Sequence, residues 1–111
     1  MTTSKNDILV VTSDIVPGRE VDEALGLVRG TTVRARHVGA DIVASVRSVF
    51  GGEISEYTAM VAGAREQALD RLRDEARALG ANAVIAMRFE SSSGAKGEVD
   101  VLVYGTAVRL K

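Results

Sequence analysis

Residues 55–79, SEYTAMVAGAREQALDRLRDEARAL, decide the fold, because apolar side chains recur there at every third or fourth position. That spacing predicts a helix with one apolar stripe and a charged opposite side. Ser55 is a favourable N-cap, and Gly80 follows as the residue type that most often ends a helix. The predicted stripe consists of Tyr57, Val61, Ala64, Ala68, Leu72, Ala76 and Leu79.

The remaining side chains of this helix are mostly small or charged. Six alanines keep the helix slim, so another element can approach it closely. Asp70 lies three positions before Arg73, and Asp74 lies three positions before Arg77. Opposite charges at this spacing form ion pairs on a helix surface. We therefore expect two such pairs on the charged side.

Downstream of the helix the apolar period changes to two, which is typical of strands. The predicted strands cover residues 84–90, with Ile85, Met87 and Phe89 on one face, and residues 98–110. A polar hairpin loop over residues 91–97, which includes Lys96, joins them. The last strand is apolar on both faces and must be covered on both. One face carries Val99, Val101, Val103 and Ala107, and the other carries Leu102, Tyr104, Val108 and Leu110.

Upstream of the helix, two further strands are predicted over residues 8–13 and 20–33, with a turn at Pro17–Gly18 between them. Gly26 and Gly30 lie inside the second of these strands. A glycine in a strand marks either a bulge or the close approach of another backbone.

A short helix over residues 41–50, ended by Gly51 and Gly52, completes the set of elements. The order β-β-α-α-β-β predicts one α+β domain over residues 1–111, with residues 1–6 as a flexible tail. Its small, mainly antiparallel sheet would carry both helices on one face. An uncovered apolar face usually marks a protein interface, so we expect a homo-oligomer in which the second faces meet.

Composition excludes several classes of protein. The chain has 111 residues, no Cys and a single His, so it has no disulfide framework and no thiolate metal site. Fourteen Lys and Arg against fifteen Asp and Glu give a net charge of -1, which argues against nucleic acid as a partner. No apolar stretch approaches the roughly 20 residues of a membrane span. The N-terminus is polar, and we expect a cytoplasmic protein.

Five short motifs together resemble the YbjQ-like family of small, uncharacterised proteins, whose domain is labelled "putative heavy-metal-binding". The resemblance covers about residues 15–108 and implies a small α/β subunit that assembles into a ring, a pentamer, without implying an activity. The motifs are GG at 51–52, EY at 56–57, AREQA at 64–68, LGANAV at 79–84 and YGTAV at 104–108.

The sequence predicts no metal ligands within one chain. His37 is the only imidazole and follows Arg34 and Arg36, whose charges repel a metal ion. Glu98 and Asp100 share one face of the last strand, but two carboxylates are too few for a closed site for a hard cation. A symmetry axis of an oligomer would multiply any single ligand, which keeps a metal shared between subunits open.

Five residues are candidates for binding a ligand. Gly51 and Gly52 precede a helix N-terminus, a place where anions bind, although a glycine pair between helices also serves as a turn. Tyr57, Arg65 and Asn82 are polar members of the matching motifs. Each also has a structural interpretation: Tyr57 as a core residue, Arg65 in a salt bridge between subunits, and Asn82 in a tight turn that tolerates positive φ.

Three functions remain open from the sequence. The favoured one is a non-enzymatic homo-oligomeric module that binds a small molecule at a subunit interface. The second is a metal-binding protein whose ligands come from several subunits. The third is an enzyme whose site forms only between subunits, since no catalytic triad, Cys/His pair or acidic dyad is present in the sequence. No cofactor is indicated.

Overall fold

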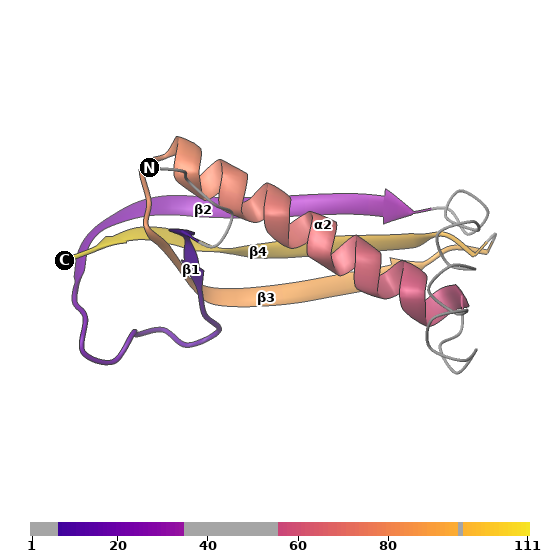
Figure 1. Ribbon diagram of the computed structural model, residues 1–111, viewed down its shortest axis with the longest axis horizontal. Helices are drawn as coiled ribbons and strands as arrows, with labels where there is room; N and C mark the ends of the chain where they lie inside the picture. The colour runs from indigo at the N-terminus through magenta and orange to yellow at the C-terminus, as the bar shows by residue number, and fades with distance from the viewer. Residues whose placement is uncertain (1–6, 35–55, 96) are drawn as a thin grey trace.

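A computed structural model describes residues 7–34, 56–95 and 97–111. One helix lies across one face of a sheet, as Figure 1 shows. The predicted α+β class is therefore confirmed, and the described residues contain one helix, whereas the predicted helix over residues 41–50 lies outside them. The elements are β1 (Leu9–Val10), β2 (Val21–Arg34), α2 (Glu56–Ala78), β3 (Ala83–Ser93) and β4 (Val99–Leu110).

The sheet is mixed, with the order β1-β3-β4-β2. β3 pairs with β4 and β4 with β2 in antiparallel fashion, whereas β1 runs parallel to β3. The predicted strand over residues 8–13 is thus only two residues long. Two backbone hydrogen bonds extend its contact with β3. The Val11 amide donates to the Val84 carbonyl at 2.9 Å, and the Val11 carbonyl accepts from the Met87 amide at 3.1 Å.

Helix α2 crosses the sheet obliquely and packs mostly against β2 and β4 (Figure 1). Its fully buried residues follow a spacing of four, and Met60 opens this series, which the predicted stripe lacked. Val61 is only half-buried, and Leu79 is 44% exposed, because it lies beyond the last turn of the helix. The other members of the buried stripe are Ala64, Ala68, Leu72 and Ala76.

Gly30 of β2 explains why a slim helix is required. A Cβ built at Gly30 would lie 2.7 Å from the Leu72 amide nitrogen and would collide with the Ala68 carbonyl. The backbones of strand and helix are therefore in direct contact, as the glycine and alanine pattern predicted. Gly26 fulfils the other prediction: its φ is 119°, and the register with β4 shifts between Ala24 and Gly26, which is a bulge.

The end of α2 also follows the prediction. Ala81 donates its amide hydrogen to Ala76 at 3.0 Å, and Gly80 donates to Arg77 at 3.0 Å. This pair of bonds is the arrangement in which a left-handed residue terminates a helix, and Gly80 has a φ of 84°.

A second bulge in β3 was not predicted. The register with β4 shifts between Ile85 and Arg88, and Ala86 has a positive φ of 54°. The extra residue moves Phe89 to the face that carries α2, while Ile85 stays on the opposite face. The prediction that Ile85 and Phe89 share a face is therefore wrong. Gly105 of β4 lies beneath the bulge, where a Cβ would be 2.6 Å from Val84 Cγ1.

The connection from β3 to β4 is shorter than the predicted loop over residues 91–97. Ser91 pairs with Val101 and Ser93 pairs with Val99, so β3 continues through three serines. Their polar side chains favour a loop, but the partner strand satisfies the backbone whatever the side chains are. The turn is closed by the Gly94 amide, which donates to Glu98 at 2.9 Å.

The two faces of the sheet are covered to different extents. Val99, Val101 and Val103 lie beneath α2 and are fully buried, so the helix takes this face of β4. On the other face, Val108 and Leu110 form a small cluster with Val16. We call the rest of that surface the helix-free face, defined by the residues that the register places opposite α2: Leu27, Arg29, Thr31 and Val33 of β2, Ile85, Arg88, Glu90 and Ser92 of β3, and Asp100, Leu102, Tyr104 and Thr106 of β4.

Side chains of α2 occupy two backbone groups at the outer edge of β2. Glu75 accepts a hydrogen bond from the Arg29 amide at 3.3 Å, and Arg71 donates to the Thr31 carbonyl. Gln67 accepts from the hydroxyl of Thr32 at 2.6 Å. These three helical residues are spaced by four positions and follow the strand. By contrast, no described strand pairs with the outer edge of β3 beyond its first half.

Candidate functional site

A hollow of about 210 Å³ lies on the helix-free face, where β3 and β4 approach their hairpin. Leu102 gives it an apolar part, and the carboxylates of Glu90 and Asp100 stand on two neighbouring strands. The register explains this grouping, because Glu90 pairs with Leu102 and Ser92 pairs with Asp100. Ser91 and Ser92 complete the lining, so the hollow is acidic and open to solvent.

The same face carries cationic side chains next to this hollow. Tyr104 lies between Arg29 of β2 and Arg88 of β3 in the register. Arg88 is engaged, because its guanidinium donates to the Thr12 carbonyl at 2.9 Å. Within the described ranges, the guanidinium of Arg29 and the carboxylates of Glu90 and Asp100 form no hydrogen bond or ion pair.

A second hollow, of about 200 Å³, lies on α2 and is lined by Thr58, Val61, Ala62 and Arg65. Arg65 is exposed, and among the described residues it has no ion-pair partner. This places one of the predicted ligand-binding residues at a concave surface with one cation and otherwise mostly small or apolar side chains.

Asn82 has a structural role in the described fold. Its side-chain amide donates to the Leu110 carbonyl at 3.2 Å, and its side-chain oxygen accepts from the Leu110 amide at 2.8 Å. The Asn82 side chain thus makes the two hydrogen bonds that the backbone of a neighbouring strand residue would make with Leu110. These bonds fix the end of β4. The positive φ expected at Asn82 is absent, because Gly80 supplies the left-handed residue of this turn.

The predicted ligand-binding residues do not form one site in the described residues. Arg65 and Asn82 are separated by more than half of α2, and a helix rises about 1.5 Å per residue. Tyr57 lies in the first turn of α2. Gly51 and Gly52 lie outside the described residues.

The residues of the hollow on β3 and β4 escaped prediction because they belong to different strands. Asp100 was considered with Glu98, its neighbour in sequence, but Glu98 precedes β4 and lies against Gly94. The partner that the structure supplies is Glu90, ten positions earlier, and only the register of the hairpin could have shown this.

The metal donors of the chain do not fit a heavy-metal site in the described residues. Soft metals prefer thiolate and imidazole ligands, and the chain has no Cys and one His. That residue, His37, lies outside the described residues. No group of three or more His, Cys, Asp or Glu that would hold an ion occurs in residues 7–34, 56–95 and 97–111.

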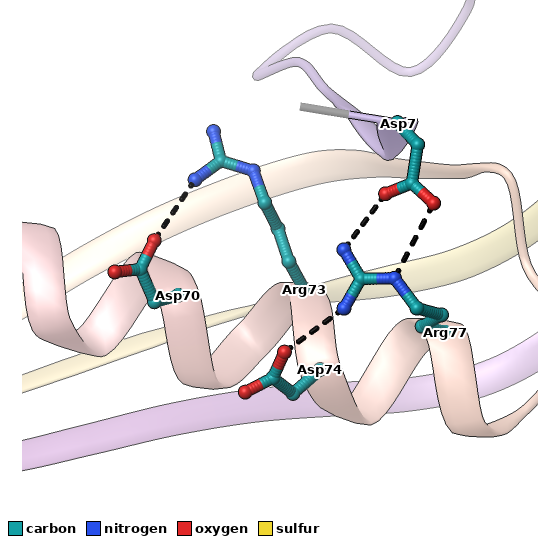
Figure 2. A network of polar contacts seen from close by, with 5 residues as sticks. All are labelled: Asp7, Asp70, Arg73, Asp74 and Arg77. Atoms are coloured by element: carbon teal, nitrogen blue, oxygen red, sulfur yellow. Dashed lines mark hydrogen bonds and ion pairs between the residues drawn. The ribbon is translucent and has the colours of Figure 1, made fainter. Parts of the chain in front are cut away.

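Charged residues also link the N-terminal segment to the end of α2, as Figure 2 shows. Arg77 donates to Asp7 through two nitrogens, at 2.7 and 3.3 Å, and to Asp74 at 2.9 Å. The hydrogen bond from Arg77 lowers the pKa of Asp7, and the same bond raises the pKa of Arg77. Asp70 lies 3.7 Å from Arg73, so both predicted ion pairs on the helix are confirmed.

No helix in the described part of the chain is long and apolar enough to cross a membrane.

The chain is similar to known proteins along nearly its whole length. A UPF0145 protein of Archaeoglobus fulgidus is 50% identical over 107 residues, which are 96% of this chain and 99% of that protein. A UPF0145 protein of Thermus thermophilus is 50% identical over 105 residues, 95% of this chain and 92% of that one.

The fold is similar to a crystal structure of a protein of unknown function from the DUF74 family of Pediococcus pentosaceus. The TM-score is 0.64 at 16% identity, with 94% of this chain and 98% of that chain covered. The YbjQ family model, described as "Putative heavy-metal-binding", matches residues 8–111. With nearly its whole length matched, and with relatives at half identity, the chain belongs to the YbjQ family of UPF0145 proteins.

Proposed function

We propose that this protein is a non-enzymatic module that assembles from identical subunits in the cytoplasm and binds a small molecule where subunits meet. The resemblance to the YbjQ-like family supports a pentameric ring of single-domain subunits. The observation that carries the proposal is the helix-free face, on which Leu27 is 63% and Val33 is 67% exposed.

The energetics favour covering this face. Full burial of a large apolar side chain contributes about 1.5–3 kcal/mol. Leu27, Val33, Leu102 and Tyr104 all lie on this face, and the last two are half-buried in one subunit. Their summed burial is comparable to the roughly 4–15 kcal/mol that association costs in lost freedom. Because α2 occupies the other face, a second copy on the helix-free face would complete the core.

The hollows support a binding role at subunit interfaces. An interface on the helix-free face would enclose the hollow at Glu90 and Asp100, and a neighbour on α2 would enclose the hollow at Arg65. Gly51, Gly52, Tyr57, Arg65 and Asn82 remain the candidate ligand-binding residues, with Arg65 supported by its hollow.

A metal role is the second candidate, favoured by the family description and by the two carboxylates of the hollow. It requires several subunits to contribute ligands to one ion. Carboxylates prefer hard cations, so this candidate predicts Ca²⁺ or Mg²⁺ rather than a soft metal.

Native mass spectrometry of the purified protein tests the proposal. We expect one defined oligomer, with a small molecule released when the subunits are dissociated. Elemental analysis of the same sample tests for a stoichiometric metal, which would favour the second candidate. A folded monomer at micromolar concentration would contradict the assembly, because the helix-free face would then remain in water.

A further inference from the structure

We infer that the helix-free face carries the charges that orient a second copy of this chain: Arg29 of one copy enters the hollow between Glu90 and Asp100 of the next. This inference rests on the proposed assembly and adds which residues meet. It concerns a docking surface made of the apolar residues of this face together with two charged patches.

The first step of the argument is that these charges are unsatisfied in a single copy. Arg29 lies on β2, whereas Glu90 lies on β3, and β4 separates the two strands. In the register, Tyr104 is the neighbour of Arg29 and Leu102 is the neighbour of Glu90. Two neighbouring side chains of β4 thus stand between the opposite charges. No hydrogen bond or ion pair joins these charges in the described residues.

The second step is that other arginines of the chain already donate hydrogen bonds within it. Arg88 donates to Thr12 and Met87, at 2.9 and 2.8 Å, and Arg71 donates to the Thr31 carbonyl. Arg109 forms an ion pair with Glu23 at 2.7 Å. Arg29 uses only its backbone amide, which donates to Glu75. In the described residues its guanidinium donates no hydrogen bond, so all of its donors are open to a partner.

The third step concerns the chemistry of the hollow. A guanidinium presents a planar set of donors that matches two carboxylates, and Glu90 and Asp100 stand on neighbouring strands around one concavity. Leu102 gives the stem of the arginine an apolar surface, as such stems usually require. The hydroxyl of Ser92, which pairs with Asp100, offers a further acceptor on this face.

The fourth step is symmetry. The cation and the hollow are different patches of one face, so Arg29 of one copy can meet the hollow of the next and the reverse. This pairing occurs twice about a two-fold axis, and a head-to-tail repetition of it closes into a ring when the rotation between copies divides a full turn. Each copy gives one arginine and receives one, so every Arg29 and every hollow has a partner in a closed assembly.

Charge reversal tests the inference on the full chain. Arg29→Glu and Glu90→Arg should each raise the dissociation constant of the oligomer at least about thirty-fold, because truncating one partner of an interfacial charge pair has effects of this size. The double variant Arg29→Glu/Glu90→Arg should recover most of the affinity. Light scattering and native mass spectrometry measure the assembly, and circular dichroism confirms that each variant is folded.

The matched control is Asp14→Arg, which changes the net charge as Glu90→Arg does but lies on the exposed segment before β2. It should leave the assembly unchanged. Asp100→Arg replaces Glu90→Arg if that variant fails to fold.

The outcomes separate this inference from the proposed function. A wild-type oligomer that both single reversals leave intact overturns the inference and retains the assembly. Dissociation of both single variants without recovery in the double variant also overturns the pairing. A wild-type monomer overturns the proposed function and this inference with it.

Discussion

Beneath α2 the sheet presents Val99, Val101 and Val103, all fully buried, whereas its opposite face presents Leu27 and Val33 to solvent. The same strand, β4, contributes to both faces. The covered face mixes valines with glycine and alanine, which lets the helix backbone come close. The helix-free face mixes large apolar side chains with unpaired charges. One face is thus suited to folding of a single chain and the other to recognition between chains.

The largest expected effect comes from placing a charge on each face of β4 in turn. Val101→Asp buries a carboxylate beneath α2, which costs several kcal/mol against a total stability of roughly 5–15 kcal/mol. We expect this variant to be unfolded in thermal melting by circular dichroism. Leu102→Asp, one residue away, should fold but lose the oligomer in light scattering. If the two variants had the same thermal stability and the same oligomeric state, the assignment of one face to folding and the other to assembly would be contradicted.

Two glycines where α2 and β2 meet, Gly30 of β2 and Gly63 of α2, offer the next comparison. Gly30→Ala places a methyl group against the Ala68 carbonyl and the Leu72 amide, neither of which can move freely. Overpacking of this kind typically costs about 1–3 kcal/mol. Gly63→Ala is the matched control, because the atoms nearest to its Cβ would belong to the flexible guanidinium of Arg34, the first at 3.3 Å. Denaturant unfolding should show that the first variant loses stability and that the second is neutral or gains, since alanine favours a helix by about 1 kcal/mol.

A smaller effect is expected at Asn82, which fastens the end of β4. Asn82→Ala removes both hydrogen bonds with Leu110 and leaves that backbone partly unsatisfied. We expect a loss of about 1–3 kcal/mol in chemical denaturation. Asn82→Asp keeps the acceptor for the Leu110 amide but turns a carboxylate oxygen toward the Leu110 carbonyl, so it should not recover the lost stability. If both variants retained wild-type stability, the contact would be unimportant and a ligand role for Asn82 would be favoured.

The smallest effect concerns acid. The bond from Arg77 lowers the pKa of Asp7, so the folded chain holds this carboxylate charged more firmly than the unfolded chain does. Its stabilisation is present above the unfolded pKa of about 3.9 and is lost as the pH falls through the lower folded pKa. The melting temperature of the wild type should therefore fall more steeply between about pH 5 and pH 3 than the melting temperature of Asp7→Asn. Parallel curves would show that this contact does not contribute.

Local features of the fold were predictable, because they depend on residues close in sequence. The helix, its end at Gly80 and its two ion pairs follow from spacing and residue type, whereas the glycines of β2 left open which one marks a bulge and which a close approach. The bulge at Ala86 was not predictable from the sequence, since it arises where β3 meets Gly105 of β4. That bulge decides which side chains of β3 share a face.

The candidate site was harder to predict for the same reason. Arg65 was identified and lines a hollow, whereas Asn82 proved to hold β4 in place. The grouping of Glu90 with Asp100 depends on the register of the hairpin, which a strand pattern alone leaves undetermined. The short pairing of β1 likewise depends on a parallel contact with β3, which is far away in sequence.

The contacts of Gln67, Arg71 and Glu75 with β2 limit how this sheet can grow. Fibrous aggregation through strands needs two open edges, so that each added chain leaves a new edge for the next. In the described part of the chain, side chains of α2 occupy the Arg29 amide and the Thr31 carbonyl of one edge. A strand that joins the remaining edge of β3 therefore meets a sheet whose opposite edge is hindered by the helix. This hindrance disfavours growth of fibres through strand pairing, even though the protein exposes an apolar face.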